Sequence, residues 1–243
     1  MENNNSNYVY DNVIQVNDSD SSRRFLASVF AWMFVALGIS AFAAYSFANS
    51  PALLQTLVNT TTGQLTGVAY LIMFAPLAFV LLIRFGLNRL SYGVLSILFV
   101  AYAAVTGISL SFILLAFTAS SVLGVFLTSS VVFGIMAIAG YTTHTDLTKF
   151  GSLLIMFLIG IIVASLINMF IHSSGLDMII SYVGVAIFVG LTAYDVQKLK
   201  RIGAGLEYGD ATTKKYALMG GLTLYLDFIN LFLMLLRVFG RRR

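Results

Sequence analysis

Two aspartates lie in stretches that otherwise have the composition of membrane-spanning helices. Asp195 lies in FVGLTAYDVQKLK, and Asp227 lies in GGLTLYLDFINLFLMLL. A carboxylate at the centre of a span costs about 2.5–3.5 kcal/mol on insertion scales, so its presence there points to a role. Two carboxylates in contact in a low-dielectric medium share one proton and titrate as a unit. The two residues are therefore the candidates for proton sensing and gating.

Such a pair holds its two helices together when it is protonated and no longer does so when it is deprotonated. While the proton is shared, it ties the two helices together. Once it is lost, two negative charges repel each other or recruit a cation. Calcium is the hard cation that carboxylate and carbonyl oxygens prefer. Asp195 and Asp227 are therefore also the candidate calcium contacts.

Helical spacing gives each aspartate polar neighbours. Thr223, Asp227 and Asn230 follow one another at steps of four and three, and Thr192 precedes Asp195 by three. Residues at these steps share one face of a helix. A polar face inside a membrane bundle points toward another polar face or a watery cavity. We expect the two faces to meet, with Thr192, Thr223 and Asn230 as supporting polar groups.

The two aspartates lie at the same depth in the membrane only if the last helix has a particular start or shape. Asp195 lies just before Lys198, whereas Asp227 is twelve residues beyond Lys215, about 18 Å along a helix. The two meet only if the last helix starts well out in the cytosol or bends. The Gly220–Gly221 pair is the expected bend site.

Arg84 and Arg89 follow the second apolar stretch and have two interpretations. Either one could compensate an aspartate as an ion pair and act as a latch in a closed state. Both could also be ordinary topology anchors at the cytosolic boundary. The aspartates have a plain structural interpretation too, as hydrogen-bonded glue between neighbouring helices.

The composition excludes several classes of protein. Of 243 residues, 59% are hydrophobic and only 10% are charged, against about 25% charged in soluble domains. The chain has no cysteine and only two histidines, His144 and His172, which excludes disulfides, thiolate chemistry and a histidine-rich metal centre. A net charge of +4 indicates topology and lipid contact rather than a nucleic-acid partner.

Seven segments approach the length of about 20 apolar residues that a helix needs to cross a bilayer. They predict an all-α, polytopic membrane protein. The segments are 25–47, 67–83, 92–117, 122–140, 153–171, 178–197 and 216–239. Small residues at every fourth position in the first and third segments are expected to let helix backbones approach closely. They are Ala36, Ser40 and Ala44, and Ala103, Gly107 and Ser111.

Basic residues alternate between the connections as the positive-inside rule requires, with the N-terminus in the cytosol. Residues 1–22 are expected to be a flexible cytosolic tail, and residues 23–243 the transmembrane helical domain. The basic residues on the cytosolic side are Arg23, Arg24, Arg84, Arg89, Lys149, Lys198, Lys200, Arg201, Lys214 and Lys215. The length of the last segment favours a full crossing of the membrane. Such a crossing places Arg237 and Arg241–Arg243 on the non-cytosolic side, which contradicts the positive-inside rule.

GLTAYDVQKLK followed by LTLYLDFINLFLMLLRVFG resembles the signature of the transmembrane Bax inhibitor motif family. The resemblance extends over the membrane domain from about Arg23 to Gly240, in span count and order, and favours a bacterial member. It implies a seven-helix bundle with the last helix at its centre and a pH-sensitive calcium leak. The family's two-aspartate sensor maps onto Asp195 and Asp227. Its gating arginine lies at the cytosolic end of the second helix.

At that end Arg89 and Arg84 both fit, and Arg89 is slightly favoured. Some members of the family carry an acidic residue within the second helix, but this chain has none between Asp20 and Asp146. One part of the family's ion path is therefore in question here.

Three functions compete on these grounds. The first is a calcium leak channel, not an enzyme, in the bacterial inner (plasma) membrane, with calcium as the transported species, no cofactor, and lipid and protons as its partners. The second is a regulatory protein that binds another membrane complex, such as a protease or a death-related factor. The third is an intramembrane aspartyl protease, since Tyr194–Asp195 resembles half of such a dyad. The LYLD stretch lacks the glycine-rich approach that a substrate strand needs.

Overall fold

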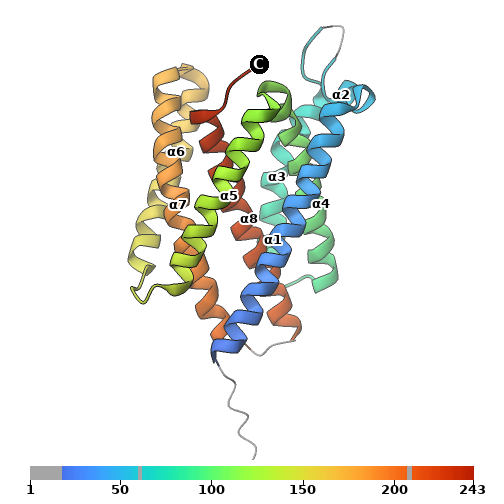
Figure 1. The fold of residues 1–243 in the computed structure, drawn as a ribbon. Helices are drawn as coiled ribbons and strands as arrows, with labels where there is room; N and C mark the ends of the chain where they lie inside the picture. Colours follow the sequence, from blue (N-terminus) through green and yellow to red (C-terminus); the bar gives the residue numbers. More distant parts are fainter. Residues whose placement is uncertain (1–17, 60–61, 207–209) are drawn as a thin grey trace, which may run out of the picture.

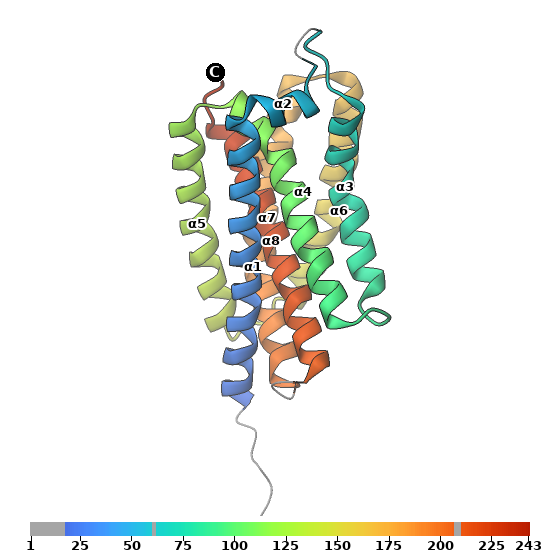
Figure 2. The same cartoon turned by 90° about the vertical axis from the view of Figure 1, so that its right-hand side faces the viewer.

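The computed structural model describes residues 18–59, 62–206 and 210–243, which form eight helices (Figure 1). Seven are long and apolar enough to cross a membrane, and α2 is a short helix at one end of the bundle (Figure 2). Apart from two isolated bridges, these residues contain no strand, so the all-α prediction is confirmed. The helices are α1 (Asp18–Asn49), α2 (Pro51–Leu57), α3 (Gly67–Gly86), α4 (Tyr92–Ala116), α5 (Ala119–Thr142), α6 (Thr148–Ile171), α7 (Ser174–Ala204) and α8 (Ala211–Phe239).

Each expected span is found, but most of the helices are longer than the apolar stretches. α7 continues to Ala204 through a lysine- and arginine-rich stretch, and α8 begins at Ala211, five residues before the expected start. Lysine and arginine are good helix formers, so a helix need not end where the hydrocarbon does. α1 begins at Asp18, so the last residues of the expected tail are helical, and Ser22 Oγ donates to Lys200 O. The rest of that tail lies outside the described residues.

Polar side chains cap the N-termini of four of the helices. The hydroxyls of Thr66, Ser91 and Ser173 accept hydrogen bonds from backbone N–H groups in the first turns of α3, α4 and α7. Asp210 does the same for α8 through the N–H of Thr212. Each cap satisfies a donor that the helix itself leaves without a partner. Hydrogen bonds from Thr212 and Ala211 also lower the pKa of Asp210.

The last helix is central, as expected. α8 packs against α1, α4, α5 and α7, while α3 packs mainly against α4, and α6 against α7. Leu218, Leu222, Leu224 and Leu231 of α8 are almost completely buried. The outer helices instead expose large apolar side chains to the surroundings, such as Phe85 and Phe170. A helix that is apolar on nearly every face suits the middle of a membrane bundle.

The two expected small-residue seams pack against each other. α1 and α4 form the most extensive helix pair, and a Cβ on Gly107 would overlap the backbone of Ser40. This close approach needs the hydrogen atom of glycine in place of a side chain. The seam therefore fixes the distance between α1 and α4.

α1 begins and α8 ends at opposite ends of the bundle (Figure 1). The 29 residues of α8 span about 43 Å at 1.5 Å per residue, more than the hydrocarbon core needs. This arrangement agrees with the expected full crossing. It places Arg237 and Arg241–Arg243 at the opposite end from Arg23 and Arg24.

Candidate functional site

The antiparallel pair α7 and α8 sets the level of each candidate side chain. A Cβ built on Gly220 would lie 2.8 Å from Leu199 Cδ2, so these residues are opposite each other. Further along, a Cβ on Gly184 would lie 2.9 Å from Met234 Sδ. The two contacts define one register, which runs along both helices. Glycine at each position lets the helices approach closely.

This register places Asp227 level with Thr192, one helical turn away from Asp195. The gap is about 4.5 Å along the axis. Side chains tilt toward the N-terminus of their own helix, so in an antiparallel pair Asp195 and Asp227 tilt toward each other. Their carboxyl groups come within hydrogen-bonding reach. The predicted meeting of the two aspartates is therefore present in the structure.

The early start of α8 explains how the two aspartates reach the same depth. The helix begins at Ala211, about 24 Å before Asp227 at 1.5 Å per residue. α7 also continues past Asp195 to Ala204. Together with α1, both helices extend beyond α4, α5 and α6 at this end of the bundle (Figure 1). The early start brings the two aspartates together, as the first of the two expected conditions required.

Asp227 is the more deeply buried of the two aspartates, and one of its carboxyl oxygens lacks a hydrogen-bond partner in the part of the chain that the structure describes. Asp227 is only 5% exposed, and its Oδ2 atom accepts no hydrogen bond within the described residues. Two ionised carboxylates contain acceptors alone, so a hydrogen bond between them requires a proton on one side. A proton shared between Asp195 and Asp227 would supply such a donor. Two carboxyl groups so placed can form a proton-sensitive contact between two helices.

A cavity of about 860 Å³ opens beside the pair, between α3, α6, α7 and α8. In Figure 2, α3 and α6 both lie toward the right-hand side of the bundle, with α6 behind α3. Most of the wall is apolar. Its polar lining residues are Arg84, Ser165, Tyr194, Asp195, Lys198, Tyr216, Thr223, Asp227 and Asn230.

Two of the three expected supporting groups line this cavity. Thr223 Oγ1 donates to Met219 O, and Asn230 Nδ2 donates to Leu226 O. The Thr223 hydroxyl proton and one of the two Asn230 N–H groups are thus used within α8, and the oxygen atoms of both side chains are left as acceptors. Thr192 differs from the expectation. It is fully buried, its hydroxyl donates to Phe188 O, and it does not line the cavity.

The structure separates the two candidate arginines. Arg84 lies in the last turn of α3 and lines the cavity beside Asp195. Arg89 follows the helix, in a turn where its N–H donates to Gly86 O, and is absent from the cavity wall. The slight preference for Arg89 is therefore not supported by its position. Arg84 is exposed but reaches the cavity wall from the last turn of α3, whereas Arg89 lies beyond the helix.

Lys198 is a further charged group that the sequence analysis assigned only to the cytosolic flank. It lines the cavity, and its Nζ atom lies 5.8 Å from the ring centre of Tyr194. Its spacing could have predicted this position, because a residue three positions after Asp195 shares the same face of the helix. Two cations therefore face the acidic pair, Arg84 from α3 and Lys198 from α7.

No group of three or more histidine, aspartate or glutamate side chains gathers among the residues that the structure describes. Asp195 and Asp227 are two carboxylates with amide and hydroxyl oxygens nearby. Such a donor set suits transient contact with a hard cation.

Residues 22–243 match the family described as "Inhibitor of apoptosis-promoting Bax1". The chain is 46% identical to the inner membrane protein YbhL of Escherichia coli K12 over 220 residues, which cover 90% of this chain and 92% of that protein. It is 43% identical to an uncharacterized protein of Borreliella burgdorferi, over 90% of this chain and 93% of that one. A Rickettsia prowazekii protein is 40% identical, with 91% of both chains covered.

Proposed function

Because the chain belongs to the Bax inhibitor family of membrane proteins, we propose that it is a pH-sensitive calcium leak channel gated by Asp195 and Asp227. The observation that carries this proposal is the approach of the two carboxyl groups at the wall of one cavity. Neither group has a structural need to be there, since both α7 and α8 are held by extensive apolar packing. A buried acid without such a need is a functional group in a membrane protein.

The gate operates through the charge of the pair and the position of Arg84. When the pair loses its proton, it carries two negative charges and attracts the guanidinium across the cavity. This attraction draws α3 toward α7 and closes the path. When the pair holds a proton, its net charge falls and Arg84 is released. Calcium flux is then higher at mildly acidic pH than at neutral pH.

The cation path uses the oxygen atoms of the cavity. Calcium prefers carboxylate and carbonyl oxygens and exchanges its ligands readily. Asp195 and Asp227 provide the charged contacts, and Thr223 and Asn230 provide neutral oxygens on the same face of α8. A site with few ligands holds calcium weakly, which a conducting path needs.

The test is calcium entry into proteoliposomes at mildly acidic and neutral pH. Asp195→Asn and Asp227→Asn are each expected to abolish the difference between the two pH values, since an amide carries neither the proton nor the charge. Asp146→Asn is the matched control, because Asp146 lies in the α5–α6 connection, away from the cavity. Unchanged pH dependence in both pair variants, or no flux in the wild type, contradicts the proposal.

We also place the protein in the bacterial inner membrane with its N-terminus in the cytosol. The Escherichia coli relative is an inner membrane protein, and the basic residues of this chain follow the positive-inside rule through six spans. Cysteines introduced singly at Arg23 and at Arg243 test this orientation. A membrane-impermeant thiol reagent added to intact cells is expected to label the second variant alone, and labelling of the first alone would reverse the orientation.

A further inference from the structure

The segment after α8 folds back onto the connection between α4 and α5. Thr118 N–H donates to Arg241 O at 3.0 Å, and Arg243 N–H donates to Ala116 O at 3.0 Å. Arg241 N–H also donates to Ser121 Oγ at 2.9 Å. These bonds hold the backbone of the three arginines at one place on the end of the bundle. The arginines are thus a fixed cluster.

The protein supplies little negative charge to balance this cluster. The side chains of Arg241, Arg242 and Arg243 are exposed, and none forms an ion pair within the described residues. The sequence has no acidic residue between Asp20 and Asp146, so α3, α4 and α5 contribute none. The nearby Asp177 is already paired with Arg237, at 3.5 Å. No acidic side chain of the described residues is therefore paired with this cluster of positive charge.

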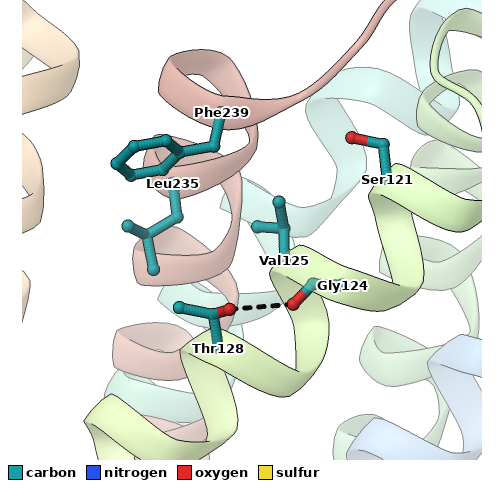
Figure 3. Close-up of a pocket in the computed structure, with 6 residues that line it drawn as sticks. All are labelled: Ser121, Gly124, Val125, Thr128, Leu235 and Phe239. Carbon is teal, nitrogen blue, oxygen red and sulfur yellow. Dashed lines mark hydrogen bonds between the residues drawn. The ribbon is translucent and has the colours of Figure 1, made fainter.

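An apolar groove of about 340 Å³ lies between α5 and α8 (Figure 3), and it is joined to the arginine segment at Ser121, which accepts the hydrogen bond from Arg241 N–H. Ser121, Gly124, Val125, Thr128, Leu235 and Phe239 line it. The hydroxyl of Thr128 donates to Gly124 O, and Ser121 accepts from Arg241. Below Ser121 the groove therefore offers apolar surface from Val125, Leu235 and Phe239.

We propose that this groove and the three arginines bind one anionic phospholipid. Its phosphate lies against the guanidinium groups of Arg241–Arg243, and one acyl chain lies in the groove along Val125 and Leu235. Arginine is well suited to phosphate because its N–H groups match the oxygens in pairs. The groove starts where the helices end, at the level of the headgroups, and runs into the apolar band of the membrane.

A lipid fits both halves of the site, whereas a soluble anion would occupy only the arginines. The lining residues Gly124, Thr128 and Phe239 are themselves exposed, so the groove opens toward lipid. Under the proposed orientation, the bound lipid also neutralises a basic cluster that the positive-inside rule disfavours on that side. The site differs from the acidic pair in location, elements and charge.

The experiment is native mass spectrometry of the purified full chain with an equal mixture of phosphatidylglycerol and phosphatidylcholine. The wild type is expected to retain phosphatidylglycerol about tenfold better, because that lipid has a net negative charge whereas the choline cation balances the phosphate of phosphatidylcholine. A triple variant, Arg241→Gln, Arg242→Gln and Arg243→Gln, is expected to lose this preference. Its control replaces Arg23, Lys149 and Lys214, exposed cations at the other end of the bundle, with glutamine.

A second pair of variants tests the groove alone. Gly124 lines it and has open space around an added Cβ, as does Gly134 two and a half turns further along α5. Gly124→Leu fills the groove and is expected to reduce retention of both lipids, whereas Gly134→Leu leaves retention unchanged. Equal retention in the wild type and the arginine triple variant overturns the proposal. So does equal retention in the two leucine variants.

Discussion

Tyr225 in α8 and Ser40 in α1 share a hydrogen bond of 2.7 Å in the buried core. Ser40 has one hydroxyl proton and donates it to Ala103 O at 2.7 Å, so Tyr225 is the donor in the shared bond. The bonds join α1, α4 and α8. Tyr225 precedes Asp227 by two residues, about 200° around the helix. Anchoring Tyr225 on one side of α8 therefore turns Asp227 toward the cavity on the other.

Ser40→Ala is expected to destabilise the protein by about 1–2 kcal/mol, because it leaves the buried Tyr225 hydroxyl without a partner. Tyr225→Phe removes only the donor, and Ser40 keeps its bond to Ala103, so the expected loss is about 0.5–1 kcal/mol. The double variant should lose less than the sum. Unfolding in detergent measures all three, with Tyr45→Phe, an exposed tyrosine of α1, as the control. Additive losses would show that the two side chains do not interact.

Gly140 in α5 lies against the backbone of Ala193 in α7, and a Cβ there would overlap the Ala193 carbonyl. Gly140→Ala is expected to lower stability by about 1–3 kcal/mol, since backbone cannot move aside as a flexible side chain does. Gly134→Ala on the same helix meets nothing and should be neutral or slightly stabilising, as alanine favours helix. The melting temperatures of the two variants in detergent give the comparison. Equal shifts would contradict close packing at Gly140.

Much of the fold could be predicted from apolar length alone. Segment length identifies the seven spans because a bilayer sets a minimum for each helix. It does not place helix ends in water, where charged residues continue α7 to Ala204. It also misses α2, since seven residues are too few to leave a clear periodicity. The seam of Ser40 and Gly107 could be predicted because small residues have a direct steric meaning.

The site was predictable where helix phase alone determined it. Asp227, Thr223 and Asn230 face the cavity, as their spacing within one helix indicated. Thr192 does not line the cavity, because at its level the packing of α7 directs it into the core. Arg84 and Arg89 could not be separated from the sequence. Their difference depends on where α3 ends and on which of its residues reach the cavity.

Asp146, in the connection between α5 and α6, is expected to make the stability of the protein depend on pH. Hydrogen bonds from Thr148, and then from Arg201 at 2.8 Å, lower the pKa of Asp146 from 3.8 to about 2. A lowered pKa in the folded state stabilises the protein above the ordinary pKa, and this contribution is lost as the pH falls through about 2. The wild type is therefore expected to be slightly more stable than Asp146→Asn at neutral pH, and the difference is expected to vanish only below a pH of about 2. Acid unfolding measures the difference, and a gap that persists at the lowest pH would contradict this assignment.

Arg84→Gln and Arg89→Gln separate a latch from a topology anchor. Arg84 lines the cavity of the acidic pair, and Arg89 does not. Arg84→Gln is expected to raise calcium flux at neutral pH about tenfold, the effect of losing roughly 1.4 kcal/mol of closed-state attraction, and so to remove the pH response. Arg89→Gln should keep the response of the wild type, because its charge acts at the membrane boundary. Proteoliposome flux at two pH values, with labelling to verify equal insertion, gives the comparison. A lost response in Arg89→Gln with a normal one in Arg84→Gln would move the latch to the connection after α3.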